Sequence, residues 1–317
     1  IQEAFDSNWV APLGPNVNGF EDDIENFLGK GVHVAALSSG TGALHLALVL
    51  LGVNAGDSVI CQSLTFSASA NPIKYLNANA IFVDSEKDTW NLCPNAVEDA
   101  IKSKLKIGLK PKAIIAVDLY GMPYKIEDIR AISKKYEIPV IEDAAEALGS
   151  TYKGKKCGTF GDISILSFNG NKIITTSGGG ALILKKKEYK NKAVYLSTQA
   201  RDDAPHYEHT TLGYNYRMSN VCAGIGRGQM EVLQERVDQR RANNAFYKEI
   251  FAGAEGISVF QEQNKNFYSN HWLSAVYINP DEAGFTREDL RLALAEENIE
   301  SRPIWKPMHL QPVFKKE

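Results

Sequence analysis

The stretch from residue 32 to residue 51 reads VHVAALSSGTGALHLALVLL and contains one abrupt change of pattern. Its first part is mostly apolar and partly β-branched, which predicts a buried strand over Val32–Ser38. Two glycines follow, and the apolar residues then continue over a length that suits a helix, Thr41–Leu51. A buried strand that leads directly into a helix is the unit from which helix-covered parallel sheets are built.

The same alternation continues along the chain to about Leu196. Further helices are predicted at Ala68–Leu76, Asn95–Leu105 and Ile126–Tyr136. Further strands are predicted at Ser58–Gln62, Ala80–Asp84, Ala113–Asp118, Pro139–Asp143, Asp162–Phe168 and Gly180–Leu184. We therefore expect an α/β fold with one broad, mostly parallel central sheet. The last two strands flank Lys172 with no predicted helix between them, so their pairing is left open.

The chain changes its character after Asn220, where a long helix is predicted over Ala223–Phe251. A strand, a Thr-capped helix and an extended segment are then predicted at Trp272–Ile278, Thr286–Glu297 and Glu300–Trp305. We expect a large α/β domain over residues 1–240 and a smaller C-terminal α+β domain over residues 241–317. Because the first residues resemble a helix interior, we also expect that the sequence lacks the beginning of a longer protein and that the small domain is truncated.

Composition and charge exclude several classes of protein. The 317 residues are 44% hydrophobic and 23% charged, with 35 Lys and Arg against 38 Asp and Glu, so no overall basic field exists to hold a nucleic acid or an anionic membrane. The longest apolar stretch, Ala43–Val53, is shorter than the roughly 20 residues of a membrane span. The cysteines are far apart, which predicts reduced thiols, no metal site and a cytoplasmic location: Cys61, Cys93, Cys157 and Cys222.

The first candidate site is the predicted helix start at Gly40, Thr41 and Gly42. Free amides at a helix N-terminus favour a phosphate group, and the glycines allow a close approach of the backbone. A simple capped turn between strand and helix has a similar sequence. The segment lacks the glycine pattern of dinucleotide sites and of nucleoside-triphosphate sites.

The second candidate site is the acidic end of the strand in VIEDAAE, residues 140–146. The carboxyl ends of parallel strands open into the ligand crevice, so Asp143 is placed to bind a metal, a sugar hydroxyl or a protonated ring nitrogen. A helix cap after the strand is the alternative interpretation. Glu142 and Glu146 are interpreted as structural or secondary contacts, with Glu146 the better site candidate.

The third candidate is Lys172, a single lysine between an apolar strand and a glycine run. Its neighbours Ile173 and Ile174 indicate partial burial, which favours the neutral amine that a nucleophile needs. An exposed hairpin turn is the alternative. A phosphate-binding helix start, an acid at a strand end and a buried amine together match the phosphate, ring nitrogen and aldehyde of pyridoxal 5'-phosphate (PLP). Phe66 is placed to stack on the ring, although a core phenylalanine has the same pattern.

Five blocks of the sequence, in this order, resemble the sugar aminotransferases of the DegT/DnrJ/EryC1/StrS family: SSGTGALHLAL, SLTFSASAN, PVIEDAAEALGS, SFNGNKIITTSGGG and GYNYRMSN. The resemblance spans nearly the whole chain and implies the PLP-dependent aminotransferase fold of type I. Within the family, STQARDDAPHYEHTTLGYNYRMSN and ESRPIWKPMHLQPVF resemble most the transaminases that make UDP-4-amino-4,6-dideoxy-N-acetylglucosamine for bacillosamine synthesis. GDP-perosamine synthases are near relatives of that branch.

The resemblance also implies roles for residues. Lys172 matches the Schiff-base lysine, Asp143 the acid that pairs with the pyridine nitrogen, and Phe66 the aromatic residue that stacks on the ring. The phosphate contacts fall on the helix start at Gly40, Thr41 and Gly42 and on Ser167. Asn215 lies in a loop that, in the family, reaches into the site of the neighbouring subunit, which implies a homodimer. Trp305 and His309 lie in the segment expected near the sugar.

Glu146 departs from the pattern, because many members of the family have Gln or His there. The implied reaction uses L-glutamate as amino donor and a UDP-linked 4-keto-6-deoxy sugar as acceptor. Three alternatives to this reaction remain at this stage. They are a related dehydratase, which has His in place of Lys172, a non-catalytic protein that binds PLP or a nucleotide sugar, and a Rossmann oxidoreductase, whose glycine fingerprint is absent.

Overall fold

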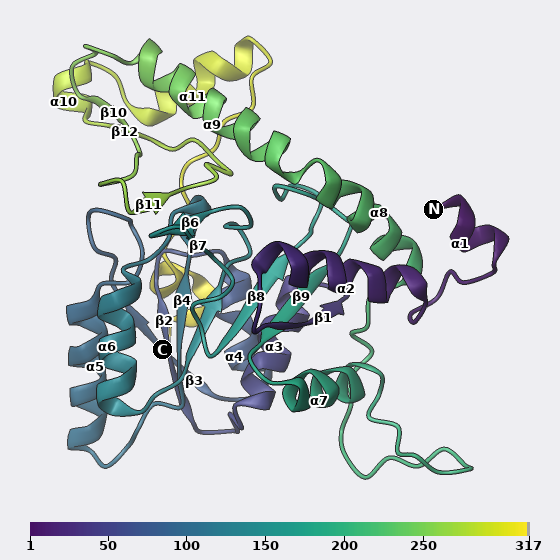
Figure 1. Ribbon diagram of the computed structural model, residues 1–317. Coiled ribbons are helices and arrows are strands. Elements are labelled where there is room, and N and C mark those ends of the chain that lie inside the picture. Colours follow the sequence, from purple (N-terminus) through teal and green to yellow (C-terminus); the bar gives the residue numbers. More distant parts are fainter. Residues whose placement is uncertain (316–317) are drawn as a thin grey trace.

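The computed structural model describes residues 1–315 and is built around a seven-stranded sheet (Figure 1). The strand order is β1-β9-β8-β5-β4-β2-β3. The strands are β1 His33–Leu37, β2 Ser58–Gln62, β3 Asn79–Val83, β4 Ala113–Val117, β5 Val140–Asp143, β8 Ile163–Ser167 and β9 Gly180–Leu184. All seven predicted strands of the central sheet are confirmed, with differences only at their ends.

The direction of β9 resolves the pairing that the sequence left open. The pairs β2–β3, β2–β4, β4–β5 and β5–β8 are parallel, whereas β9 is antiparallel to both β8 and β1. With no helix between β8 and β9, the chain reverses in a loop and returns beside β8, with Ser167 opposite Gly180. Lys172 lies in this reversing loop, at the end of the sheet where β5 also ends.

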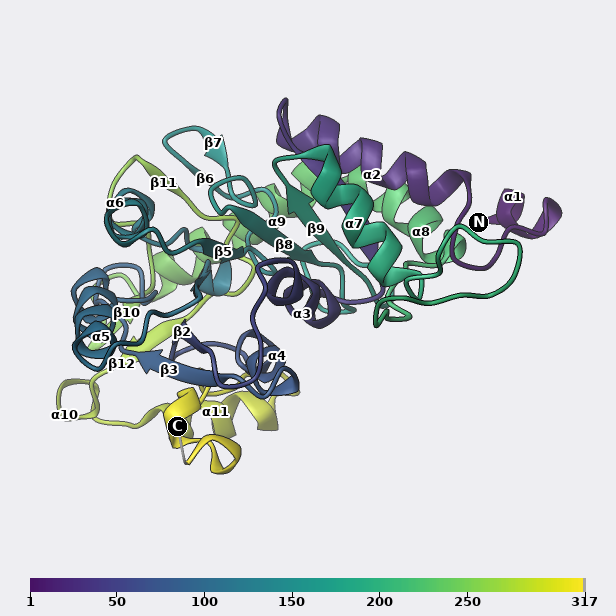
Figure 2. The same cartoon turned by 90° about the horizontal axis from the view of Figure 1, so that it is seen from below.

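Helices cover both faces of the sheet, and a separate hydrophobic core fills each side (Figures 1 and 2). One core takes side chains from α2 Pro15–Leu28, α5 Pro94–Lys106, α6 Ile126–Tyr136 and α8 Asn220–Glu231. The other takes side chains from α3 Gly40–Leu50, α4 Asn71–Tyr75 and α7 Lys187–Ser197. A sheet buried on both faces explains why its strands are continuously apolar rather than alternating.

The C-terminal part of the chain departs from the prediction at two points. The expected long helix over Ala223–Phe251 is two helices, α8 and α9 Leu233–Ile250, which meet at Val232. The expected strand from Trp272 is only Val276–Ile278, which is β12 and pairs with β10 Ile257–Val259. The alternation of Trp272–Ile278 misled here because Trp272 is buried by contacts with distant parts of the chain and not by a strand partner.

The helix predicted from Thr286 is confirmed as α11 Arg287–Glu296, with α10 Pro280–Ala283 before it. Thr286 accepts a hydrogen bond from the amide of Asp289, whose carboxylate accepts one from the amide of Thr286, so the helix starts with a complete capping box. The α9, α10 and α11 helices and the β10–β12 pair lie together above one end of the central sheet in Figure 1.

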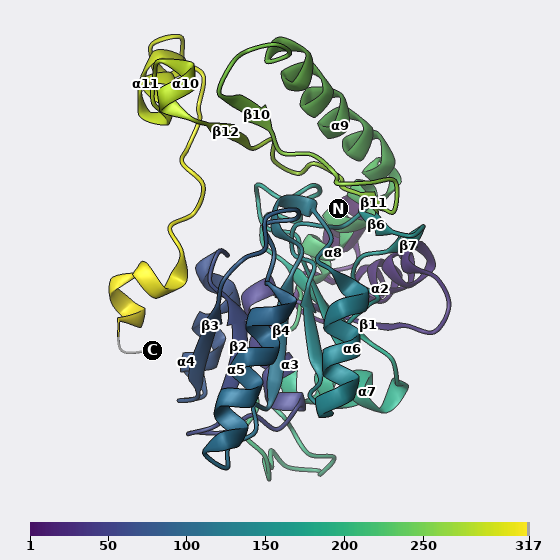
Figure 3. The same ribbon diagram turned by 90° about the vertical axis from the view of Figure 1, so that its left-hand side faces the viewer.

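Two segments of the predicted small domain pack on the large one. The strand β11 Phe267–Tyr268 pairs with β6 Thr151–Tyr152, which also pairs with β7 Lys155–Lys156. After α11 the chain runs back to the large domain (Figure 3), where Met308 and Phe314 pack with Ala70 and Phe82. The end of the sheet that carries Lys172 is therefore covered by chain from both parts.

The first residues, which resemble a helix interior in the sequence, form α1 Gln2–Asp6, and the helix predicted over Ala68–Leu76 is the 3₁₀ turn η1 Ser67–Ser69 followed by α4. The elements that were not predicted include the helices α2, α7 and α10 and the 3₁₀ turns η2 Leu119–Gly121, η3 Met308–Leu310 and η4 Pro312–Phe314. The four cysteines are free, as predicted. Among residues 1–315, no helix combines the length and the apolar character that a bilayer crossing needs.

Candidate active site

Asp143 is the last residue of the central strand β5 and is buried at the carboxyl end of that strand. Its Oδ2 accepts a hydrogen bond of 2.7 Å from Ser69 Oγ, and its Oδ1 accepts one of 3.2 Å from the amide of Ala145. Burial raises the pKa of Asp143, while these two hydrogen bonds and the charge of Lys172 lower it. The carboxylate is therefore held in one orientation and lies within the electrostatic field of the lysine.

Glu146 lies three residues after Asp143, in the loop that follows β5, and contacts Lys172 directly. Its Oε1 is 3.4 Å from Lys172 Nζ, and its Oε2 accepts a hydrogen bond of 2.7 Å from the amide of Tyr120. Burial raises the pKa of Glu146 to about 7, although the charge of Lys172 and the amide of Tyr120 oppose this rise. Glu146 thus changes its charge near neutral pH, beside the amine.

Lys172 is enclosed, since its side chain is only 10% exposed. Its Nζ lies 4.0 Å from the centre of the Trp272 ring, so the indole and the Glu146 carboxylate contact the same amine. The alternative of an exposed lysine is wrong, because only 10% of the Lys172 side chain is exposed, although the residues before it, 169–171, are exposed. The charge of the amine acts on Asp143 at the end of β5 and opposes the rise of its pKa on burial.

The start of α3 forms the third part of the site. Ser39 is the N-cap residue, and its Oγ accepts a hydrogen bond of 2.9 Å from the amide of Gly42. The amides of Gly40 and Thr41 lie in the first turn of α3, where the helix offers no preceding carbonyl group to accept from them. A Cβ atom built on Gly40 would lie 3.0 Å from Ser167 Cβ and 3.2 Å from its Oγ, so the missing side chain lets the helix start approach Ser167.

Three aromatic residues, Phe66, Tyr120 and Trp305, lie close together beside the site. Phe66 is 52% exposed and directly precedes the turn η1, whose last residue is Ser69. Its ring centre lies 5.4 Å from that of Trp305, which lies 4.9 Å from that of Tyr120. The backbone amide of Trp305 also donates a hydrogen bond of 3.3 Å to Tyr120 Oη. The alternative of a core phenylalanine at position 66 is excluded by its exposure.

His309 is held by the loop after β2. Its Nδ1 lies 2.6 Å from Ser63 Oγ, and the amide of the preceding Met308 donates a hydrogen bond of 2.7 Å to the carbonyl group of Ser63. Ser63 lies three residues before Phe66, so His309 and Trp305 approach the same loop. The returning C-terminal segment thus brings both predicted sugar-contacting residues to the large domain.

Asn215 is not brought to Lys172 within this chain. It is exposed and forms an isolated bridge with Thr198. The neighbouring rings of Tyr214 and Tyr216 stack at 5.0 Å, and Tyr216 Oη lies 3.0 Å from Nδ1 of the α3 residue His45. The loop that contains Asn215 therefore packs along α3, and its tip extends away from the body in Figure 1.

Three residues of the site were not predicted: Ser69, Tyr120 and Trp272. Ser69 occurs in SLTFSASAN, where three serines are equivalent by pattern. Tyr120 reaches Glu146 through its backbone, in a turn where it has a φ of 56°. A non-glycine residue with positive φ is uncommon, and the sequence carries no signal for it at this tyrosine. The one available signal for Trp272 was its position in the motif SNHWLS, at the start of the predicted strand.

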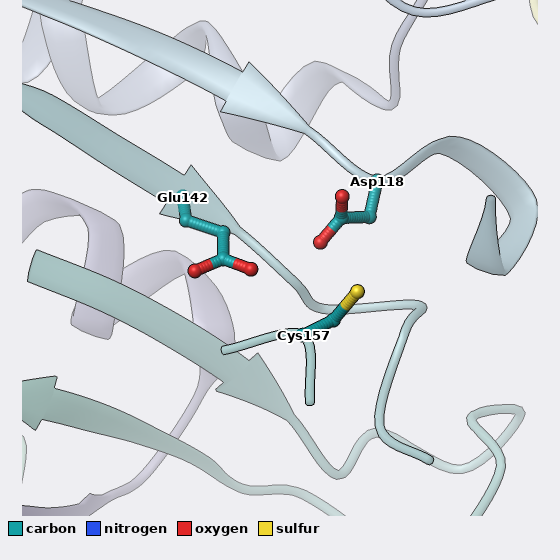
Figure 4. Close-up of side chains that lie close together, drawn as sticks. All are labelled: Asp118, Glu142 and Cys157. Atoms are coloured by element: carbon teal, nitrogen blue, oxygen red, sulfur yellow. The ribbon is translucent and has the colours of Figure 1, made fainter. Parts of the chain in front are cut away.

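Asp118, Glu142 and Cys157 form a buried cluster (Figure 4), and Glu142 lies on the face of β5 opposite Asp143 because successive strand residues alternate between faces. Ligand-type atoms of Asp118, Glu142 and Cys157 lie within 4.8 Å of one another. The carboxylate of Glu142 accepts hydrogen bonds from the amides of Gly158, Phe160 and Gly161 and from Ser164 Oγ. These donors hold the turn before β8, which supports the interpretation of Glu142 as structural.

The sequence and the structure both match known proteins. The family model of the DegT/DnrJ/EryC1/StrS aminotransferases matches residues 1–317. The chain belongs to this aminotransferase family. It is 51% identical over 314 residues to the putative pyridoxal phosphate-dependent aminotransferase EpsN of Bacillus subtilis, covering 99% of this chain and 80% of that protein.

Two further comparisons extend this result. The chain is 38% identical over 317 residues to a GDP-perosamine synthase of Escherichia coli O157:H7, covering 99% of this chain and 83% of that protein. A crystal structure of a DegT/DnrJ/EryC1/StrS aminotransferase from Brucella abortus superposes with a TM-score of 0.91 at 28% identity, over 99% of this chain and 82% of that one. The chain is therefore a PLP-dependent sugar aminotransferase with the α/β fold of type I.

The residues present fit PLP. The two free amides at the α3 start and the adjacent Ser167 provide donors for a phosphate. Burial raises the pKa of Asp143 and the charge of Lys172 opposes this rise, so a cationic ring nitrogen beside the carboxyl group would favour its anion further. Lys172 supplies an enclosed primary amine for the aldehyde.

Proposed function

We propose that the chain transfers the amino group of L-glutamate to a nucleotide-linked 4-keto-6-deoxy sugar and so forms a 4-amino-4,6-dideoxy sugar nucleotide. The observation that carries this proposal is the position of Lys172 Nζ. It is enclosed, lies 3.4 Å from Glu146, and is near enough to Asp143 for its charge to oppose the burial-raised pKa of that acid. The membership of the family supports the reaction class, and the substrate is proposed.

Each part of the site has a proposed role toward PLP. The helix start at Gly40, Thr41 and Gly42, together with Ser167, holds the phosphate. Asp143 pairs with the ring nitrogen, and Phe66 stacks on the ring with its exposed face. The bound cofactor supplies an electron sink that makes the carbon atoms of both substrates acidic enough for proton transfer.

Lys172 has two proposed tasks. Its Nζ would be the group that holds the aldehyde of the cofactor between turnovers. The free Nζ then takes a proton from the α-carbon of L-glutamate, and in the second half-reaction it gives a proton to C4 of the sugar. Glu146, in contact with the same Nζ, is placed to stabilise the ammonium form during these transfers.

The sugar side of the site is proposed to include Trp305 and His309, which the C-terminal segment places beside the loop of Phe66. We also propose a homodimer in which Asn215 reaches the partner's site. Its loop is exposed, and Tyr207 and Leu212 near the tip are each 78% exposed. A partner subunit that covers this loop would bury both side chains. We expect such an enzyme to work in the cytoplasm.

The substrate proposed first is UDP-2-acetamido-2,6-dideoxy-4-hexulose, on the resemblance to the bacillosamine branch. The second candidate is the GDP-linked sugar of perosamine synthesis, which the 38% identity to a GDP-perosamine synthase supports. Turnover of L-glutamate with UDP-, GDP- and dTDP-linked 4-keto sugars separates the two. The proposal predicts the highest kcat/KM with the UDP sugar, and a preference for the GDP sugar moves the assignment to the perosamine branch.

The same assay tests a non-catalytic role. Release of 2-oxoglutarate on mixing the PLP-loaded protein with L-glutamate is expected from an aminotransferase, and a protein that only binds PLP or a nucleotide sugar releases none. The dehydratase alternative is disfavoured by Lys172 itself, since those relatives have His at that position.

A further inference from the structure

We propose that Trp272 is a positioning residue for the reactive amine, holding Lys172 at both its backbone and its side chain. The proposal rests on the role of Lys172 in the proposed function. The indole Nε1 donates a hydrogen bond of 2.7 Å to the carbonyl group of Asn171, the residue directly before the lysine. The ring of the same indole lies 4.0 Å from Lys172 Nζ.

These two contacts fix different parts of the lysine. The hydrogen bond to Asn171 holds the reversing loop between β8 and β9, and the ring face stabilises a positive charge at Nζ. Glu146 contacts the same Nζ at 3.4 Å. The amine therefore has two electron-rich contacts, one an acid that titrates near neutral pH and one an aromatic face that does not titrate at all.

Trp272 is itself held rigidly, with only 2% of its surface exposed. Its amide donates a hydrogen bond of 2.8 Å to Asn270 Oδ1, and Asn270 Nδ2 donates to the carbonyl groups of Glu146 and Leu148 at 2.8 and 2.9 Å. One asparagine side chain thus ties the backbone of Trp272 to the loop that carries Glu146. The two contacts of Nζ are built as one unit.

Gly121 makes this arrangement possible. A Cβ atom there would lie 1.9 Å from Asn270 Oδ1, and the backbone has a φ of 90°, so a side chain at this position would displace Asn270. The adjacent residue, Tyr120, donates the amide hydrogen bond to Glu146. The turn after β4 therefore leaves room for Asn270 and holds Glu146 at the same time.

The role proposed for Trp272 is to keep the amine of Lys172 in place. While Lys172 is free of the cofactor it must carry and release a proton without turning away from the site. The indole face offers the ammonium form a fixed place beside Glu146, and the bond to Asn171 prevents the loop from moving when the amine is released. Trp272 therefore acts on the reaction through Lys172.

The test compares Trp272→Leu, Trp272→Phe and the control Trp90→Leu in the full-length protein. Trp90 is a suitable control because its ring stacks on Phe260 at 4.1 Å in the same hydrophobic cluster as Trp272. The first readout is the acylation rate of Lys172 by acetic anhydride in the cofactor-free protein, measured across pH by mass spectrometry of the Lys172 peptide. The second is kcat and KM for L-glutamate in the PLP-loaded protein.

We expect Trp272→Leu to raise the acylation rate of Lys172 at neutral pH by roughly tenfold, the order of effect of a desolvated cation–π contact. Its kcat should fall by at least the same factor, with KM for L-glutamate unchanged. Trp272→Phe keeps a ring but loses the indole donor, so its acylation rate should stay within about twofold of wild type while kcat falls. Trp90→Leu should match wild type in acylation.

Acylation rates of Trp272→Leu that equal those of wild type at every pH would overturn the proposal. If circular dichroism shows that Trp272→Leu does not fold, Trp272→Phe decides, and an unchanged kcat in that variant overturns the proposal. The proposed function fails separately, when borohydride reduction of the wild-type, PLP-loaded protein attaches no cofactor to Lys172. The acylation measurement requires no turnover, so the two failures are distinguishable.

Discussion

Ser69 Oγ donates a hydrogen bond of 2.7 Å to Asp143 Oδ2 and so joins the loop after β2 to the end of β5. Ser69 ends the turn η1, which begins directly after Phe66. The residue proposed to stack on the cofactor ring and the acid proposed to pair with its nitrogen are thus held by one short turn. Thr65 Oγ1, at 2.7 Å from Ser69 Oγ, fixes the serine from its other side.

Replacement of Ser69 tests this link. Ser69→Ala removes a hydrogen bond to a buried carboxylate, whose typical contribution is about 1.5–3 kcal/mol. We therefore expect PLP to bind at least roughly tenfold more weakly, as measured by fluorescence titration of the cofactor-free protein. The control is Ser67→Ala in the same turn, which should leave the affinity unchanged. Equal affinities for both variants and wild type would remove Ser69 from the site.

The helix start can be tested with two glycines. Gly40→Ala places a Cβ atom 3.0 Å from Ser167 Cβ, in the space proposed for phosphate approach. We expect weaker binding of PLP by at least about an order of magnitude. Gly228→Ala is the matched control, because a Cβ atom there meets no atom within 4 Å and alanine is favoured over glycine in a helix interior by about 1 kcal/mol.

For Gly228→Ala in α8 we expect unchanged cofactor affinity and a higher free energy of unfolding, measured by urea denaturation. The contrast separates a local effect at the phosphate position from a general effect of adding a methyl group to a helix. A Gly40→Ala protein that binds PLP as tightly as Gly228→Ala would place the phosphate elsewhere.

The raised pKa of Glu146 predicts that the free energy of unfolding depends on pH, and it fixes the sign of that dependence. Folding raises the pKa of Glu146 from 4.5 to about 7, so the folded state binds more protons than the unfolded state in this range. The contribution of Glu146 to stability is present in full below pH 4.5 and is lost as the pH rises to about 7. Glu146→Gln cannot titrate and should lack this loss.

The measurement is the free energy of unfolding of the cofactor-free protein at several pH values between 4.5 and 7. The difference between wild type and Glu146→Gln should change across this window by a few kcal/mol at most. A difference that is constant with pH would show that Glu146 titrates as an ordinary, solvent-exposed glutamate.

The buried cluster on the opposite face of β5 gives two contrasting predictions. Asp118 Oδ2 has no hydrogen-bond partner among residues 1–315, and burial raises the pKa of Asp118 well above its ordinary value. Burial thus favours the neutral form of Asp118, which the amide of Asn imitates, and Asp118→Asn should fold with unchanged or greater stability. Glu142→Gln places an amide group among four hydrogen-bond donors and should lower the free energy of unfolding by about 2–4 kcal/mol. Thermal denaturation of the two variants at neutral pH measures this contrast, which equal melting temperatures would contradict.

Much of the large domain was predictable because its strands are short, continuously apolar and separated by helices. The pattern predicted the ends of β2 and β9 to the residue. It also placed Asp143 at the carboxyl end of its strand and Lys172 just after the end of another strand, and the carboxyl ends of parallel strands lie at the same end of a sheet. What the pattern could not give was the antiparallel direction of β9, which depends on the path of a loop.

The remaining errors share one physical cause, which is dependence on contacts between distant segments. The alternation of its neighbours predicts a strand that starts at Trp272, whereas Trp272 is buried in a cluster with Leu119 and Met122 and contacts Asn171 and Lys172, all distant in the chain. The break at Val232 leaves the helical pattern of the sequence intact. Ser69 and Tyr120 act through one hydroxyl and one amide, which no periodicity reveals.

The central claim is that Lys172 Nζ is the amine that binds PLP and moves the protons. The measurement is borohydride reduction of the PLP-loaded protein, followed by mass spectrometry of its peptides, with turnover of L-glutamate and the keto sugar measured for Lys172→Ala. We predict that the cofactor is attached to the Lys172 peptide alone and that Lys172→Ala has neither attached cofactor nor turnover. Attachment to another lysine, or turnover by Lys172→Ala at the wild-type rate, would contradict the claim.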